Sequence, residues 1–243
     1  MSREAQSLLV TLLGAASLRL SFTDVYLRYV KEGLRPFLLI AGLLLVVLGV
    51  VSLWRDVVAR RNPDAAAEAQ QLEAEEQAGH DHAHGPAVAW LLVLPIMAIF
   101  LVAPPALGAY SAGRGSSTVA KPDTGFPALP KGDPVALTLT DYAGRAVWDE
   151  GSLSGRAVRM RGFVAPRPGG GYYLARLTIA CCAADSRPVK ISVRGAEASF
   201  PADTWIELTG RYLPGIERTG SDVVPRIQAV SVREIPSPRQ PYE

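Results

Sequence analysis

Two long apolar runs constrain what this chain can fold into more than any other feature. Residues 36–54, PFLLIAGLLLVVLGVVSLW, run about 19 residues without a charge, and residues 86–110, PAVAWLLVLPIMAIFLVAPPALGAY, run about 25. An α-helix rises about 1.5 Å per residue, so either run is long enough to cross a hydrocarbon layer roughly 30 Å thick. Helices in a soluble core seldom go so long without a polar face. We therefore predict that both runs span a membrane.

A third, weaker candidate lies at residues 5–18, AQSLLVTLLGAASL, with about 14 uncharged residues. It fits a tilted span or an interfacial helix better than a signal peptide, because no clean cleavage site follows it. The chain thus has two to three spans. The basic residues before residue 36 favour two spans with a cytoplasmic C-terminal part, whereas the apolar length of the third run favours three spans and export. We take a multi-pass cell-membrane protein with an extracytoplasmic C-terminal domain as the prediction.

The composition changes along the chain and suggests its organisation. We predict a transmembrane region at 1–110 with a polar loop at 55–85, a Gly/Ser/Pro-rich linker at 111–134, a β domain at 135–236 and a tail at 237–243. Short alternating runs divided by Gly, Pro and Asp are typical of strands with one buried face. We find at least five of them and no convincing helix in the β domain: AVRMRGFVAP, YYLARLTIA, RPVKISVRG, DTWIELTGRYLP and RIQAVSVREIP.

The predicted fold class follows from these segments. It is a membrane α-helical N-terminal part with two to three spans plus an all-β C-terminal domain, which we expect to be a small OB-like barrel. The net charge of +2 is too small to favour a nucleic-acid partner.

All three histidines of the chain, His80, His82 and His84, lie in the stretch GHDHAHG. Neutral imidazole is the commonest protein ligand for transition metals, and in an extended chain alternate side chains point to the same side. A polar loop that happens to be His-rich is the alternative. We predict weak, exchangeable binding of zinc or another transition metal by these residues.

The two cysteines, Cys181 and Cys182, are adjacent and are followed by Asp185 in the stretch CCAAD. A disulfide between them would be strained, because consecutive Cα atoms lie about 3.8 Å apart and disulfides usually need about 4.4–6.8 Å. A metal site is a second interpretation, in which Cys181 and Cys182 as thiolates, together with Asp185, hold a soft or borderline ion, although zinc sites normally space their cysteines by two or more residues. Packing is the third: if the pair continues the preceding strand, one thiol points into the barrel. Spacing alone leaves all three open.

We expect no enzymatic activity. The β domain has no histidine, so a Cys–His nucleophile cannot be built there. The sequence also has no Gly-rich phosphate loop and no H-E-x-x-H or G-x-S-x-G motif.

The layout resembles the YcgQ-like family, an uncharacterised bacterial membrane family described as a putative permease subunit, in its actinobacterial form. The resemblance rests on DVYLRYVKEGLRPFLLIAG, the His-rich loop, RMRGFVAP, DTWIELTGRYLP and a final PYE. Its most specific part is the pattern R-x-x-I-x-C-C-x-A-D, present here as Arg176, Ile179, Cys181, Cys182, Ala184 and Asp185. The resemblance implies that the cysteines and the aspartate belong to a family motif.

The resemblance also implies a function. Members of this family typically accompany a predicted multi-span permease and have a suspected link to zinc homeostasis. We therefore expect an integral membrane accessory subunit of a permease, with the lipid bilayer and the permease as partners. A membrane-anchored thiol redox protein and a non-catalytic structural scaffold are the alternatives.

Overall fold

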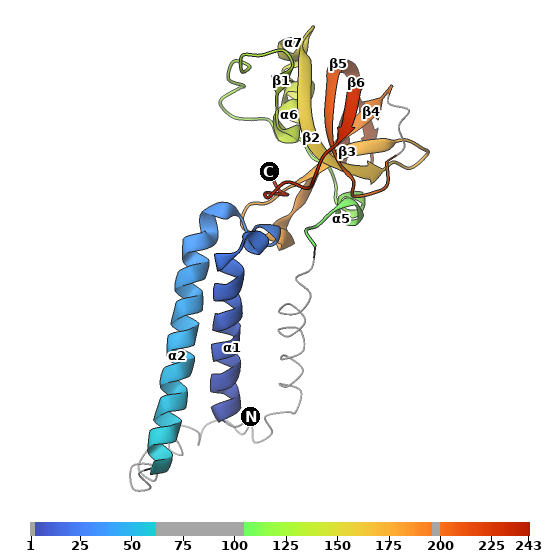
Figure 1. The fold of residues 1–243 in the computed structure, drawn as a ribbon. Helices are drawn as coiled ribbons and strands as arrows, with labels where there is room; N and C mark the ends of the chain where they lie inside the picture. The colour runs from blue at the N-terminus through green and yellow to red at the C-terminus, as the bar shows by residue number, and fades with distance from the viewer. Residues whose placement is uncertain (1–2, 62–104, 196–199) are drawn as a thin grey trace. The chain divides into compact units, whose positions relative to one another are not determined.

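The structure is a computed structural model that describes residues 3–61, 105–195 and 200–243 of the chain (Figure 1). It divides into two compact units. The first comprises Met1–Tyr26 and Glu32–Pro105, and the second comprises Leu27–Lys31 and Ala106–Glu243. The second unit therefore includes a short segment from the N-terminal part of the chain. We call this segment, Leu27–Lys31, the connector.

The first unit is a pair of helices, α1 (Arg3–Phe22) and α2 (Arg35–Arg61), which lie side by side (Figure 1). Glycines permit their close approach, since a Cβ on Gly14 would lie 2.8 Å from the carbonyl oxygen of Gly42. The Ser7 hydroxyl donates to that of Ser52 at 2.7 Å. Small residues and hydroxyls at a helix–helix contact are common in membranes.

Helix α2 coincides with the predicted span at 36–54 and presents many apolar side chains outward. Among the described residues, the stretch Glu32–Val58 is the one helix long and apolar enough to cross a membrane. Such a helix fits a membrane anchor and also a signal sequence. Helix α1 covers the candidate at 5–18 but does not meet the same criterion, and most of the candidate at 86–110 lies outside the described residues. The described chain thus has one candidate span, not the predicted two to three.

The second unit is built around a closed β-barrel of five strands, as the alternating sequence patterns predict. The five barrel strands are β2 (Ala157–Pro166), β3 (Tyr172–Thr178), β4 (Arg187–Arg194), β5 (Trp205–Thr219) and β6 (Asp222–Glu234). They pair in the order β2-β3-β4-β6-β5, and β5 pairs with β2 to close the barrel. Within the barrel β4 and β6 are parallel, whereas the other pairs are antiparallel. A two-residue strand β1 (Val135–Ala136) adds to β2 in parallel.

The expectation of no helix in the β domain is wrong, because α6 (Leu139–Trp148) and α7 (Glu150–Leu153) lie between β1 and β2. The Thr138 hydroxyl caps α6 by accepting the backbone N–H of Asp141 at 3.0 Å. Gly144 sits inside this helix, and a Cβ there would lie 2.9 Å from the ring of Phe126. Gly144 lowers the helix propensity of this segment, and a side chain at this position would press against the Phe126 ring.

The segment predicted as a linker, 111–134, contacts the barrel. Its short helix α5 (Ala109–Arg114) begins before it and is counted with the barrel unit. Ser117 donates its N–H to Asp222 at 2.7 Å and accepts the N–H of Val223 at 2.8 Å. The Trp148 indole donates to the Val119 carbonyl at 3.3 Å. These bonds fix the chain's entry into the barrel.

Leu174 provides a test of the barrel core, because it is fully buried and lies opposite Ile191 on the neighbouring strand. We predict that Leu174→Ala lowers the free energy of unfolding by about 2–5 kcal/mol through lost burial and a cavity. Val230→Ala, at a position 67% exposed, serves as the control and should change it by less than about 0.5 kcal/mol. Denaturant unfolding of the full-length protein in detergent measures the free energy of unfolding of both variants. Equal losses in the two variants would contradict the placement of Leu174 in the barrel core.

Candidate metal centre

The two cysteines lie in the loop that connects β3 to β4, which we call the dithiol loop (179–185). Strand β3 ends at Thr178, and the 3₁₀ turn η4 (Ala183–Asp185) leads into β4. The cysteines therefore do not continue the strand. Ile179, at the start of the loop, is buried in an apolar cluster together with Leu177 and Tyr242. This anchors the loop on the barrel and leaves the following residues at the surface.

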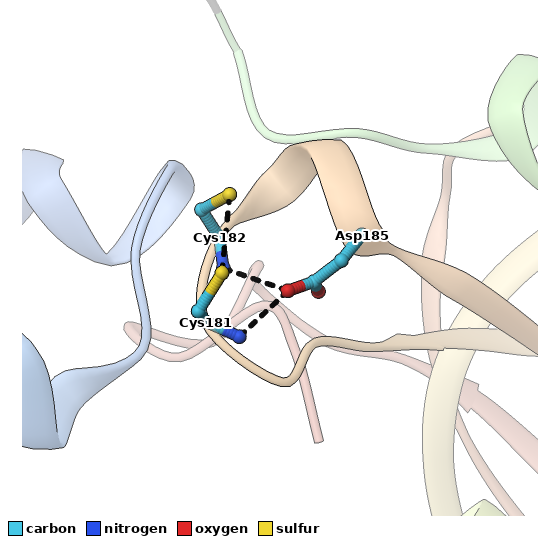
Figure 2. A group of neighbouring side chains, drawn as sticks. All are labelled: Cys181, Cys182 and Asp185. Carbon is cyan, nitrogen blue, oxygen red and sulfur yellow. Dashed lines mark hydrogen bonds between the residues drawn. The ribbon is translucent and has the colours of Figure 1, made fainter.

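Asp185 organises the loop with its side-chain carboxylate. One oxygen, Oδ1, accepts the backbone N–H of Ala180 at 2.8 Å. The other, Oδ2, accepts the N–H groups of Cys181 at 2.7 Å and Cys182 at 3.3 Å. Figure 2 shows the carboxylate turned back toward the two cysteines. Three N–H groups that no strand partner reaches are thus satisfied by a single side chain.

The two thiols lie close together and are accessible. Both are free, with Cys181 exposed and Cys182 half-buried, and their sulfurs are 3.5 Å apart (Figure 2). Neither belongs to the buried clusters of the barrel core. Burial of a thiol in the core, one of the three interpretations of the sequence, does not account for this arrangement.

The carboxylate and the thiols affect one another's pKa. A hydrogen bond from the Cys181 thiol, followed by backbone N–H groups, holds the pKa of Asp185 well below its usual range. In return the hydrogen bond to Asp185, and a second one with Cys182, raise the pKa of Cys181 to about 12. The Cys181 thiol is therefore protonated at neutral pH. Because the folded-state pKa of Asp185 is lowered, its contribution to loop stability is present above the ordinary value of 3.8 and is lost as the pH falls below it.

The geometry fits chelation of a metal ion by two sulfurs. Sulfurs bound to one zinc ion at about 2.3 Å in a tetrahedron lie roughly 3.8 Å apart, close to the observed 3.5 Å. One ligand atom from each of Cys181, Cys182 and Asp185 lies within 4.8 Å of the others, which no other group of three such residues in the described chain achieves. A carboxylate has about four acceptor positions, and three are used by backbone N–H groups. The site thus offers two sulfurs and at most one oxygen.

The other predicted site residues have different positions. His80, His82 and His84 lie outside the described residues. Ala184 is exposed in the 3₁₀ turn. Arg176 contacts Trp205 and the C-terminal tail: its guanidinium stacks on the Trp205 ring at 5.2 Å and donates to the Gln240 carbonyl at 2.7 Å. This arginine fastens the C-terminal tail.

Two further segments hold the dithiol loop, and the sequence patterns assigned neither of them a role at the site. Glu243 accepts the Ile179 N–H at 3.2 Å and donates its own N–H to Leu177 at 2.9 Å. The Glu243 carboxylate also caps α6, accepting the N–H groups of Leu139 and Thr140 at 3.0 Å. The connector lies beside the cysteines and donates the Lys31 N–H to the Cys181 carbonyl at 3.0 Å. The stretches PYE and VYLRYVKEGL, quoted above for the family resemblance, contain these residues.

Comparison with known proteins finds a family match for part of the chain. Residues 148–243 match the family model described as the DUF1980 C-terminal domain, which covers the barrel strands, the dithiol loop and the tail. No curated protein matches the chain. The chain is thus similar, over less than half of its length, to an uncharacterised domain family whose matched region contains the candidate metal centre.

The effect of Asp185 on Cys181 can be tested in a Cys182→Ser background, where alkylation reports on one thiol. We predict that Asp185→Asn lowers the pKa of Cys181, so that iodoacetamide reacts at least about tenfold faster at neutral pH, since each unit of pKa changes the thiolate fraction tenfold. Asp123→Asn, which alters an exposed carboxyl elsewhere, is the control. A faster reaction with an unchanged pH midpoint would mean that the carboxylate only holds the loop.

Proposed function

We propose that this protein is a membrane-anchored accessory subunit of a permease, and that its β domain binds a transition-metal ion such as zinc through Cys181 and Cys182. The observation that carries the proposal is the pair of accessible thiols 3.5 Å apart on a loop fixed by Asp185. Two sulfurs at this separation suit one borderline or soft ion. Two sulfurs with at most one oxygen leave a tetrahedral coordination incomplete.

Several observations support the membrane and family parts of the proposal. Helix α2 exposes a continuous apolar surface, as a helix in contact with lipid does: Phe37, Ile40, Leu43, Leu44, Val47, Leu48 and Val51 are all at least 45% exposed. The match to the DUF1980 C-terminal domain is compatible with the YcgQ-like resemblance, from which the permease partner, a multi-pass location and the link to zinc come. The closed five-stranded barrel supports the OB-like interpretation.

The chemistry of the site suits exchange of an ion. Bound zinc would act here as cargo or signal held by thiolates, so both thiols must lose their protons. Because the pKa of Cys181 is raised, protons compete with the metal at neutral pH. A surface site that leaves coordination positions open can pass its ion to ligands of another protein, as an accessory subunit of a metal transporter would require. His80, His82 and His84 supply imidazole ligands in the same chain.

Cadmium titration of the full-length protein in detergent tests metal binding, because thiolate ligands give a charge-transfer absorption band. We predict one band in the wild type and its loss in the Cys181→Ser/Cys182→Ser double variant, with affinity reduced at least about 100-fold, or about 2.8 kcal/mol. The affinity of the wild type should rise with pH by up to about tenfold per unit for each proton released.

A matched variant separates the two candidate ligand sets. Replacing His80, His82 and His84 by alanine should leave the charge-transfer band in place, since imidazole does not contribute to it. Equal and negligible binding by the wild type and the double cysteine variant would remove the metal role from the dithiol. If neither variant then changed metal tolerance of cells, the scaffold function would remain.

The proximity of the sulfurs also favours a second candidate, a membrane-anchored thiol redox protein. A disulfide between adjacent cysteines would be strained and easily reduced, which suits a redox pair more than a structural crosslink. Mass spectrometry of protein from cells whose thiols were trapped distinguishes this function from metal binding. Thiols reduced under both oxidising and reducing growth conditions would contradict the redox function.

A further inference from the structure

The connector Leu27–Lys31 runs alongside the dithiol loop and pairs with it as a short strand does. Val30 and Cys182 form an antiparallel β-bridge. The Lys31 N–H donates to the Cys181 carbonyl at 3.0 Å, and the Ala183 N–H donates to the Tyr29 carbonyl at 2.7 Å. The backbone on both sides of Cys182 is therefore bonded to the connector.

Side chains strengthen this pairing from two directions. The Lys31 ammonium donates to the Ile179 carbonyl at 3.4 Å, at the start of the dithiol loop. The Tyr242 hydroxyl donates to the Arg28 carbonyl at 2.8 Å, while Tyr242 itself pairs with Leu177 at the end of β3. The connector is thus attached to the dithiol loop and to the tail that supports it.

The dithiol loop depends on two sets of partners. Asp185 satisfies the N–H groups of residues 180–182 from within the loop, and the connector satisfies the Cys181 carbonyl and the Ala183 N–H from outside. The directions of the two Cα–Cβ bonds follow from this backbone, and together with the two χ1 rotamers they set the separation of the sulfurs. A ligand that holds both sulfurs fixes the same loop conformation that the connector recognises.

We infer that the connector is the second half of the dithiol site: it positions Cys181 and Cys182 for chelation, and a metal ion held by both thiols stabilises its docking in return. The inference rests on the proposed function, because it needs a metal at the thiols. The coupling is reciprocal by thermodynamic linkage. Loosening the connector therefore lowers the affinity of the thiols for the metal, and removing the metal weakens the docking of the connector. Lys31 is a positioning residue, since it acts on the thiols through the backbone of Cys181.

The connector also links the dithiol site to the two helices along the chain. The connector lies between α1 and α2 in the chain: the 3₁₀ turn η1 (Asp24–Arg28) includes its first two residues, and the 3₁₀ turn η2 (Glu32–Leu34) follows it directly. The connector is therefore covalently continuous with both helices, including the one that contains the candidate membrane span.

Limited proteolysis of the wild type tests the coupling, because trypsin cleaves after Arg28 and Lys31 and needs locally undocked chain. With the full-length protein in detergent, we expect cadmium to slow cleavage at these two positions at least about fivefold. Cleavage at Arg218, in an exposed position of the barrel, is the internal control. In the Cys181→Ser/Cys182→Ser variant cadmium should have no effect.

A pair of variants at one position tests the positioning role. Lys31→Pro removes the N–H that bonds to Cys181, whereas Lys31→Ala keeps it. We expect Lys31→Pro to weaken cadmium binding at least about tenfold and Lys31→Ala less than about threefold. Circular dichroism of both variants verifies that the barrel remains folded.

The outcomes separate the two proposals. A cadmium band with unchanged cleavage at Arg28 and Lys31 would overturn the coupling and leave the proposed function standing. Wild-type affinity in a folded Lys31→Pro variant would overturn the positioning role in the same way. Absence of the cadmium band from the wild type would overturn the proposed function, and this inference with it.

Discussion

The Asp185 carboxylate is the contact on which the candidate site depends. A loop that leaves a barrel strand loses its ladder partners, and three consecutive N–H groups would be left without acceptors. The carboxylate accepts all three, at 2.7 to 3.3 Å, and turns the chain tightly enough for adjacent cysteines to present their sulfurs together. The same carboxylate accepts a hydrogen bond from the Cys181 thiol, which raises the pKa of that thiol. Asp185 thus contributes both to the shape of the loop and to the protonation of Cys181.

The barrel supplies the rigid base for this loop. Parallel pairing of β4 with β6 and closure of β5 on β2 leave no long free edge on the five barrel strands. The tail then adds a short parallel partner to the end of β3, where Leu177 bridges Tyr242. Because this addition lies immediately before the dithiol loop, the position of the loop is set by the barrel core on one side and by the tail on the other.

The sequence predicted the barrel strands because their pattern is local. Alternation marks each strand, and the glycines at 169, 170 and 171 adopt positive φ in the turn between β2 and β3, where other residues would be strained. Helix α6 is not predicted from the sequence because Gly144 lowers its helix propensity, while its packing against Phe126 involves a segment that is not local to it. The closeness of Cys181, Cys182 and Asp185 also followed from local spacing.

The contacts between distant segments were not predictable in the same way. Lys31 and Ile179 are 148 positions apart. Neither hydrophobic periodicity nor composition indicates that the Ile179 carbonyl will accept a hydrogen bond from a side chain so distant in the sequence. From the sequence, the polar stretch around the connector is interpreted as the flank of a membrane span. Its strand-like pairing with the dithiol loop is made by backbone N–H and C=O groups, and every residue type except proline has both. Arg176 was quoted with the cysteine motif, yet its geometry assigns it to the tail.

Under the proposed function, the chemistry of the two thiols depends on which side of the membrane the barrel faces. On an oxidising side, two exposed thiols 3.5 Å apart would be open to oxidation unless a metal ion held them as thiolates. On a reducing side they would remain free and compete for metal with the cellular thiol pool. In either case only a loop fixed before binding avoids the cost of ordering two side chains when the ion arrives. Asp185 from within and the connector from outside provide that order, which is why the affinity of the dithiol should depend on residues that never touch the metal.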